Sequence, residues 1–259
     1  TLGQEFEAYA FTLEENIERL NAAARLFLVE NMGATAIGTG INSEPEYAEI
    51  CARELRIISG EEFVLAPNLI AATPDTGACV SYSSELKRFC VQLSKVCNDL
   101  RLLSSGPRCG LNEINLPPMQ PGSSIMPGKV NPVIPEVVNQ VCFRVIGNDT
   151  TVMMAAEAGQ LELNVMEPVI VYALFTSMQM LTKVMDRLRI LCVDGITANV
   201  DHCKDMVMNS IGIVTALNPT LGYENSSRIA KRALQENRSV YDLVLEEKLL
   251  TKEELDNVL

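Results

Sequence analysis

The chain has 259 residues, of which 47% are hydrophobic, so it is long enough to bury a sizeable core in one large domain or in one large and one small domain. Its formal net charge of -12 argues against nonspecific nucleic-acid binding, which needs lysine and arginine side chains arrayed against phosphates. Aromatic residues make up 5% of the chain and tryptophan is absent, so the composition favours packed helices over sheets.

Eight cysteines are scattered along the chain without a CxxC pair. Several fall at apolar positions of helical patterns, where cysteine behaves as a small hydrophobic residue. We therefore expect neither a disulfide framework nor a zinc site, and the pattern favours a reduced, cytoplasmic protein. The uncharged stretch from Pro168 to Thr182 is too short to span a membrane, so no membrane segment is expected.

Helical periodicity begins at the first residues, with an apolar stripe of Phe6, Ala10, Leu13, Ile17, Leu20 and Ala24. No capping pattern precedes this helix beyond Thr1, so we expect the chain to be an N-terminally truncated piece of a longer protein. A glycine-rich loop at 33–42 follows, and a shorter helix is predicted over 47–60, ending at Gly60.

A strong helix is predicted over 83–103, where two apolar series recur every seven residues. The series are Leu86, Leu93 and Leu100, and Phe89, Val96 and Leu103. Interleaved series of this kind form a seam that is typical of helical bundles. Residues 104–129 lack apolar periodicity and contain many helix breakers, which predicts a long structured loop without secondary structure.

The next helix is predicted to begin near Pro132, with valines at four-residue spacing: Val133, Val137, Val141 and Val145. Polar residues fall inside this pattern and indicate buried polar pairing: Asn139, Gln140, Asn148 and Asp149. A further helix is predicted from Glu167 to about Val193.

From residue 195 onward the pattern changes to short helices of about ten residues, separated by NPTLGY, ENRS and LLTKEE. LTKEEL has the form of an N-terminal capping box. The predicted fold is therefore all-α. A long-helix bundle occupies residues 1–194, and a small all-α C-terminal domain occupies residues 195–259.

Few residue types in this chain could carry chemistry. His202 is the only histidine and lies among charged residues at a predicted helix start. It has no orienting partner nearby in the sequence, so we interpret it as a surface residue.

The stretch GSSIMPGKVNP, residues 122–132, is different. Gly122 and Gly128 can adopt positive φ, which would let backbone N–H groups form an anion-binding nest. Lys129 supplies the local cation that a dianionic substrate needs on an acidic protein, and Asn131 can both donate and accept hydrogen bonds. Ser123 and Ser124 each add a hydroxyl group. Composition alone leaves two interpretations equally open, a functional anion site and a plain interhelical loop with a solvent-facing lysine.

GSSIMPGKVNP matches every position of the pattern GSxxMPxKxNP, and on this motif the chain resembles the fumarase/aspartase superfamily. GATAIGTGIN, residues 33–42, is similar to the second conserved block of that family. NDLRLLSSGPRCGLNEINLP, residues 98–117, is similar to the segment that leads into the signature, and the resemblance covers essentially the whole chain. Within the superfamily, residues 135–170 resemble the aspartate ammonia-lyases more than the class II fumarases.

The resemblance implies a lyase that eliminates ammonia from L-aspartate to give fumarate. It implies that Ser123 is the general base, with its alkoxide stabilised by the N–H nest and Lys129. By the same resemblance, Ser124 contacts the β-carboxylate, while Lys129 and Asn131 bind the α-carboxylate and the amino end. Glu136 resembles the acid that pairs with the active-site histidine of the family.

In such enzymes the loop closes over the substrate, and Gly122 and Gly128 would serve as its hinges. The resemblance also implies a homotetramer whose active sites are each assembled from three subunits. It implies no metal site and no required cofactor, and it leaves activation by a divalent cation open. The other site residues of the family lie upstream of Thr1, so we expect this chain alone to be inactive.

Two alternatives remain open on the sequence alone. The first is a class II fumarase, which acts on malate and fumarate. The second is a non-catalytic structural helical bundle, as in the lens crystallins that are related to this superfamily.

Overall fold

The computed structural model describes residues 1–122, 125–126 and 128–258. The chain folds as two compact units. Unit 1 comprises Thr1–Leu102 and Leu116–Gly195, and unit 2 comprises Leu103–Asn115 and Ile196–Leu259. Unit 2 therefore includes residues 103–115, which precede the domain boundary predicted after residue 194.

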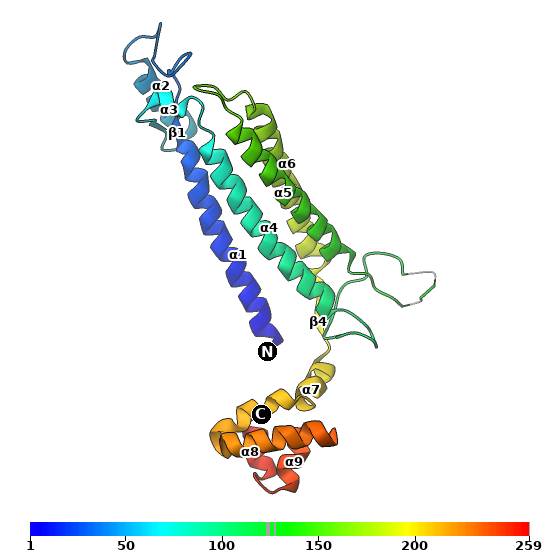
Figure 1. Cartoon of the computed structure of the whole chain (residues 1–259). Helices are drawn as coiled ribbons and strands as arrows, with labels where there is room; N and C mark the ends of the chain where they lie inside the picture. Colours follow the sequence, from blue (N-terminus) through cyan, green and yellow to red (C-terminus); the bar gives the residue numbers. More distant parts are fainter. Residues whose placement is uncertain (123–124, 127, 259) are drawn as a thin grey trace. The chain divides into compact units, whose positions relative to one another are not determined.

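Unit 1 is built on long α-helices that run side by side (Figure 1): α1 (Leu2–Ala24), α4 (Gly77–Leu103), α5 (Val133–Glu157) and α6 (Glu167–Leu191). Long helices that follow one another in the chain are antiparallel. Tyr9, near the start of α1, donates a 2.8 Å hydrogen bond to Asp99, near the end of α4. This arrangement confirms the predicted all-α bundle of long helices.

Short elements cap one end of the bundle: η1 (Arg25–Leu28), β1 (Val29–Glu30), α2 (Tyr47–Ser59), β2 (Val64–Leu65) and α3 (Leu69–Ala72). β1 and β2 form a small parallel pair. α2 ends as predicted, because Gly60 takes the left-handed conformation with φ of 75°. η2 (Val193–Gly195) follows α6.

The seam predicted for α4 is buried over most of its length. Leu86, Leu93 and Leu100 are buried, as is Phe89, whereas Val96 and Leu103 are half-buried. The four-residue valine series predicted for α5 is wrong in detail, since Val137 is 41% exposed and Val138 is fully buried. A helix has 3.6 residues per turn, so a strict spacing of four drifts away from the buried face.

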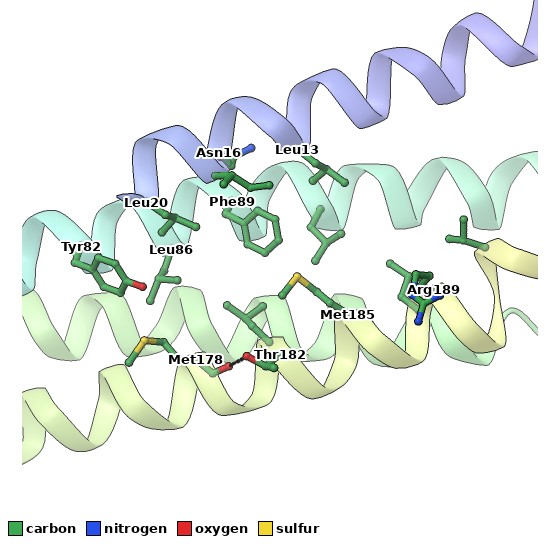
Figure 2. A pocket seen from close by; sticks show the side chains of 15 residues that line it. Leu13, Asn16, Leu20, Tyr82, Leu86, Phe89, Met178, Thr182, Met185 and Arg189 are labelled. Atoms are coloured by element: carbon green, nitrogen blue, oxygen red, sulfur yellow. Dashed lines mark hydrogen bonds between the residues drawn. The ribbon is translucent and has the colours of Figure 1, made fainter. Parts of the chain in front are cut away.

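The apolar stripe predicted for α1 is not buried within the chain. In α1 the buried residues are Asn16 and Ala23, and Ile17 is 60% exposed. Part of the stripe instead borders an apolar groove of about 550 Å³ between α1, α4 and α6. Leu20, Phe89 and Met185 point into this groove, each from a different helix (Figure 2).

Buried polar contacts join α4, α5 and α6, as the polar residues inside the α5 pattern predict. Asp149 accepts hydrogen bonds from Ser83 at 2.8 Å and from Lys87 at 2.6 Å. Asn139 donates to the Ser94 hydroxyl at 2.8 Å. Gln140 is the exception, because its side chain is exposed.

The α5–α6 interface has its own polar contact. Asn148 of α5 donates a 2.9 Å hydrogen bond to the hydroxyl of Ser177 in α6. By length and composition alone, the segment Glu167–Gly195 could cross a membrane, which the sequence analysis did not anticipate. In the structure its buried residues, among them Ile170 and Leu181, are those of a helix packed in a bundle.

Unit 2 consists of short elements: β3 (Ile114–Asn115), β4 (Thr197–Ala198), α7 (Val200–Met208), η3 (Ile211–Ile213), α8 (Val214–Glu236), α9 (Val240–Glu246) and α10 (Lys252–Val258). Its core includes Leu217, Ile229 and Leu243. The predicted capping box is confirmed, because Glu254 accepts from the Thr251 amide at 2.8 Å and donates its own amide to the Thr251 hydroxyl at 3.2 Å.

One prediction about this part of the chain is confirmed and another is wrong. The helical stretch α8 is interrupted inside the segment NPTLGY, because Gly222 has a non-helical backbone with φ of 75° and ψ of 159°, so the segment separates two helices as predicted. The segment 104–129 does contain secondary structure, because β3 pairs antiparallel with β4. β3 is only two residues long, and its partner β4 lies more than 80 residues further along the chain. No local sequence pattern therefore predicts this strand.

Four of the eight free cysteines are buried: Cys90, Cys97, Cys142 and Cys192. Burial raises the pKa of the Cys97 thiol to about 12 and that of Cys192 to about 11. A hydrogen bond with Cys142 and burial raise the pKa of Cys90. The hydrogen bond with Cys90 lowers the pKa of Cys142, but this thiol is buried like the other three. A buried thiol is not accessible to a reagent, so these four thiols should be inert in the native state.

We predict that a disulfide reagent such as DTNB at pH 8 labels the exposed Cys109 within seconds. The four buried thiols should react only as fast as the protein unfolds. Stopped-flow absorbance on native and urea-unfolded protein measures both rates. Fast labelling of five or more thiols in the native protein would contradict this packing.

Asp149 should be a major contributor to the stability of unit 1. Its removal in Asp149→Ala leaves Ser83 buried without its acceptor and Lys87 without its counter-ion. We expect a loss of about 2–4 kcal/mol in the free energy of unfolding, measured by urea denaturation. Asp186→Ala, at an exposed position on α6, is the matched control and should change stability by less than about 0.5 kcal/mol.

Candidate active site

The conspicuous loop of the sequence joins the strand β3 to the helix α5. Ser123 and Ser124, the predicted base and the predicted β-carboxylate ligand, lie outside the described residues, as does Pro127. The described part of the motif comprises Gly122, the pair 125–126 and residues 128–132.

The two ends of the motif approach each other closely. A Cβ atom added at Gly122 would lie 3.2 Å from the carbonyl oxygen of Lys129. The Lys129 amide donates a 3.2 Å hydrogen bond to the Met126 carbonyl. Gly122 and Lys129 therefore lie close to each other, and we call this close approach the neck of the loop.

Gly122 and Gly128 are each required at their positions for a different reason. Gly128 has φ of 85°, as predicted, a conformation that residues with a Cβ adopt at a cost. Gly122 is not left-handed, which corrects the expectation that both glycines adopt positive φ. At Gly122 the constraint is the close approach of the Lys129 carbonyl instead.

Lys129 is exposed, and no carboxylate in the described ranges 1–122, 125–126 and 128–258 forms an ion pair with it. Its neighbours on the loop are apolar and also exposed, with Ile125 at 87% and Met126 at 51%. A cation with no counter-ion among those ranges, on a protein of net charge -12, is available to an external anion.

Asn131 and Glu136 lie where the loop enters α5. Asn131 is half-buried and borders a narrow cleft together with Pro117 and Cys192. Glu136 is half-buried in the first turn of α5, and its amide donates to the Pro132 carbonyl at 3.1 Å. Among the described residues no side chain caps this helix terminus, so its partial positive charge is open to an anion at the loop.

Lys129, Asn131 and Glu136 thus all belong to the stretch where the loop enters α5. The apolar groove of Figure 2 is lined by none of them, and its cation, Arg189, is paired with Asp194 at 3.3 Å. In the part of the chain that is described, no group of three or more His, Cys, Asp or Glu side chains is arranged to hold a metal ion.

The sequence analysis missed the contacts that hold the segment before the loop. His202, interpreted as a surface residue, is exposed but lies with Nε2 2.8 Å from the Leu111 carbonyl oxygen. Asn199, which the sequence analysis did not single out, binds the backbone of Asn112 and Glu113. These partners lie more than 80 residues apart in the sequence, so no local pattern could reveal them.

Comparison with known proteins places this geometry in context. Residues 1–147 match the family model described as lyase, and residues 213–259 match the model described as fumarase C C-terminus. The aspartate ammonia-lyase of Helicobacter pylori (strain ATCC 700392 / 26695) is 62% identical over 258 residues, which is 100% of this chain and 55% of that protein. The aspartate ammonia-lyase of Escherichia coli (strain K12) is 56% identical over 258 residues, covering 100% of this chain and 54% of that protein. The chain therefore spans about half the length of the curated relatives it matches.

Solved structures agree with these relatives. The fumarate lyase:delta crystallin from Brucella melitensis, bound to cobalt, superimposes with a TM-score of 0.95 at 54% identity, covering 100% of this chain and 56% of that one. The class II fumarase from Schistosoma mansoni superimposes with a TM-score of 0.90 at 32% identity, covering 99% of this chain and 57% of that one. Since the lyase model matches residues 1–147, more than half of the 259 residues, the chain belongs to this lyase family, the fumarase/aspartase superfamily.

Proposed function

We propose that the protein at its natural full length is an aspartate ammonia-lyase, which eliminates ammonia from L-aspartate to give fumarate. The observation that carries the proposal is the identity of 56–62% to proteins of that name across the whole chain. Identity to the class II fumarase is 32%, which favours aspartate over malate as the substrate.

The proposed reaction removes a proton from the carbon next to the β-carboxylate and then breaks the bond between the α-carbon and nitrogen. The electron pair of the broken C–H bond is held on the β-carboxylate until it forms the double bond and ammonia departs. Donors directed at that carboxylate lower the barrier, and such electrostatic stabilisation is usually the largest contribution to catalysis. No cofactor is needed for these steps.

In this proposal Ser123 is the base and Ser124 contacts the β-carboxylate, both by resemblance to the family. Lys129 and Asn131 bind the α-carboxylate and the amino group. The support for Lys129 is its exposed ammonium group, which makes no ion pair within the described part of the chain. Glu136, in the first turn of α5, is proposed to orient a histidine of the assembled site.

We further propose a homotetramer located in the cytoplasm, with active sites shared between subunits. Large apolar side chains on the outer faces of α5 and α6 support association, since Phe143, Tyr172 and Phe175 are each more than half exposed. Eight free cysteines suit a reducing compartment.

The catalytic assignment is tested by Ser123→Ala and Lys129→Ala in the full-length protein. We expect both variants to fold, Ser123→Ala to lose several orders of magnitude in kcat, and Lys129→Ala to lose about 100-fold or more in kcat/KM. Fumarate absorbance at about 240 nm measures turnover with L-aspartate, and a parallel assay with L-malate separates the two substrate classes.

Lys231→Ala is the matched control, because Lys231 is an exposed lysine on α8 outside the proposed site. It should retain the kinetic constants of the unmodified protein. Near-normal turnover by Ser123→Ala would refute the proposed base. Turnover of malate but not of aspartate would replace the proposed function with that of a fumarase. A protein that neither binds nor turns over either substrate would indicate the structural bundle.

The proposed assembly is tested by light scattering. The full-length protein should have four times its monomer mass, and Phe143→Asp combined with Phe175→Asp should lower that mass, because charges would be buried at the interface. The 259-residue chain by itself should produce no fumarate, since its relatives of that activity are nearly twice as long. Fumarate production by the purified 259 residues would overturn this last expectation.

A further inference from the structure

Another cavity of unit 1 lies where the end of α1 meets the start of α4 (Figure 1), and we call it the α1–α4 pocket. Its volume is about 520 Å³. Residues three and four positions apart share one face of a helix, and each helix turns one such face to the pocket. The lining residues are Arg19, Ala22, Ala23 and Leu26 from α1, and Val80, Ser81, Ser84 and Glu85 from α4. None of them lines the apolar groove of Figure 2, and none belongs to the loop at 122–132.

The wall that α4 contributes carries a carboxylate whose acceptor capacity is not met. The Oε2 atom of Glu85 is buried, and no residue in the described part of the chain donates a hydrogen bond to it. A carboxylate oxygen that contacts neither water nor a donor is costly, so its presence calls for an explanation. Glu85 as a whole is only half-buried, and rotation of its carboxylate group can turn this oxygen toward a donor inside the pocket.

The wall that α1 contributes carries a cation that is also unpaired. Arg19 is exposed, and within the ranges 1–122, 125–126 and 128–258 it forms no ion pair with Glu85 or with any other carboxylate. A guanidinium group offers only donors, in a planar arrangement that matches a carboxylate. The pocket therefore presents a cation on one wall and an anion on the other, and the two do not close on each other.

We propose that the α1–α4 pocket binds an aliphatic α-amino acid as its zwitterion. The ammonium group of the ligand donates to Glu85, and its carboxylate accepts from the guanidinium group of Arg19. The apolar part of the lining, with Ala22, Leu26 and Val80, contacts an aliphatic side chain, as in small-molecule sites where a few polar groups orient the ligand. This site is separate from the candidate active site, and it does not depend on the proposed function.

The experiment measures binding of L-valine to the full-length protein by isothermal titration calorimetry. L-Valine has no β-carboxylate, so it is not a substrate for the proposed elimination and reports on the pocket alone. With both of its charges met, a ligand of this size should bind with a Kd of about 1 mM or tighter. Isobutylamine keeps only the cation and isovalerate keeps only the anion, so each should bind at least about 10-fold more weakly than L-valine.

Four variants of the full-length protein locate the binding. Glu85→Gln and Arg19→Gln each remove one charge at nearly constant shape, and each should weaken L-valine binding by about 10-fold to 100-fold. Ala22→Trp leaves both charges in place but fills the pocket, so it should abolish binding. Arg25→Gln is the matched control, because Arg25 is an exposed arginine just after α1 that does not line the pocket, and it should bind like the unmodified protein. Circular dichroism verifies that each variant is folded.

Three outcomes would overturn the inference. One is the absence of L-valine binding to the unmodified protein at about 10 mM, which would mean that Arg19 and Glu85 need no ligand. Another is binding that survives in Ala22→Trp or in both charge variants, since the ligand would then lie elsewhere. The third is isobutylamine or isovalerate binding as tightly as L-valine, because the pocket would then recognise a single charge. None of these measurements uses aspartate turnover, so the proposed function stands or falls separately.

Discussion

The register of α4 against α5 is the constraint on which the arrangement of unit 1 depends. Asp149 is buried and satisfied by Ser83 and Lys87, while about three turns away along α5 Asn139 is satisfied by Ser94. A shift of either helix by one turn would separate both sets at once. It would leave a carboxylate and an amide without partners in a core where each unmet polar group costs about 1–3 kcal/mol or more. Apolar contacts alone would tolerate such a shift far better, because leucines and valines repeat along the seam.

This register determines where the candidate site begins. Once α5 is aligned with α4, the N-terminus of α5 and the residues that enter it are placed, including Asn131 and Glu136. A rigid scaffold that carries its chemistry on a connecting loop is a common way to combine precise placement with accessible functional groups.

The sequence predicts those features whose physical cause is local. The leucine series of the predicted α4 seam is buried as predicted, Gly60 ends α2, and Thr251 and Glu254 form their capping box. Each of these depends on residues within a few turns of one another. The features that the sequence did not predict depend on distant parts of the chain. β3 forms only because it pairs with β4, and the apolar stripe of α1 is not buried by the rest of the chain.

The residues discussed for the candidate site and its surroundings show the same difference between local and distant causes. Lys129, Asn131 and Glu136 are predicted together because they lie within eight residues of one another, and all three belong to the stretch where the loop enters α5. The contacts of Asn199 and His202 with the backbone of residues 111–113 could not be predicted, because these hydrogen bonds join residues more than 80 positions apart in the sequence. The same distinction between local and chain-wide properties applies to the proposed anion site on this acidic protein. Net charge is a sum over the whole chain, whereas binding depends on the few groups nearest the ligand. Within the loop the formal charge is that of Lys129, which forms no ion pair among the residues that the structure describes.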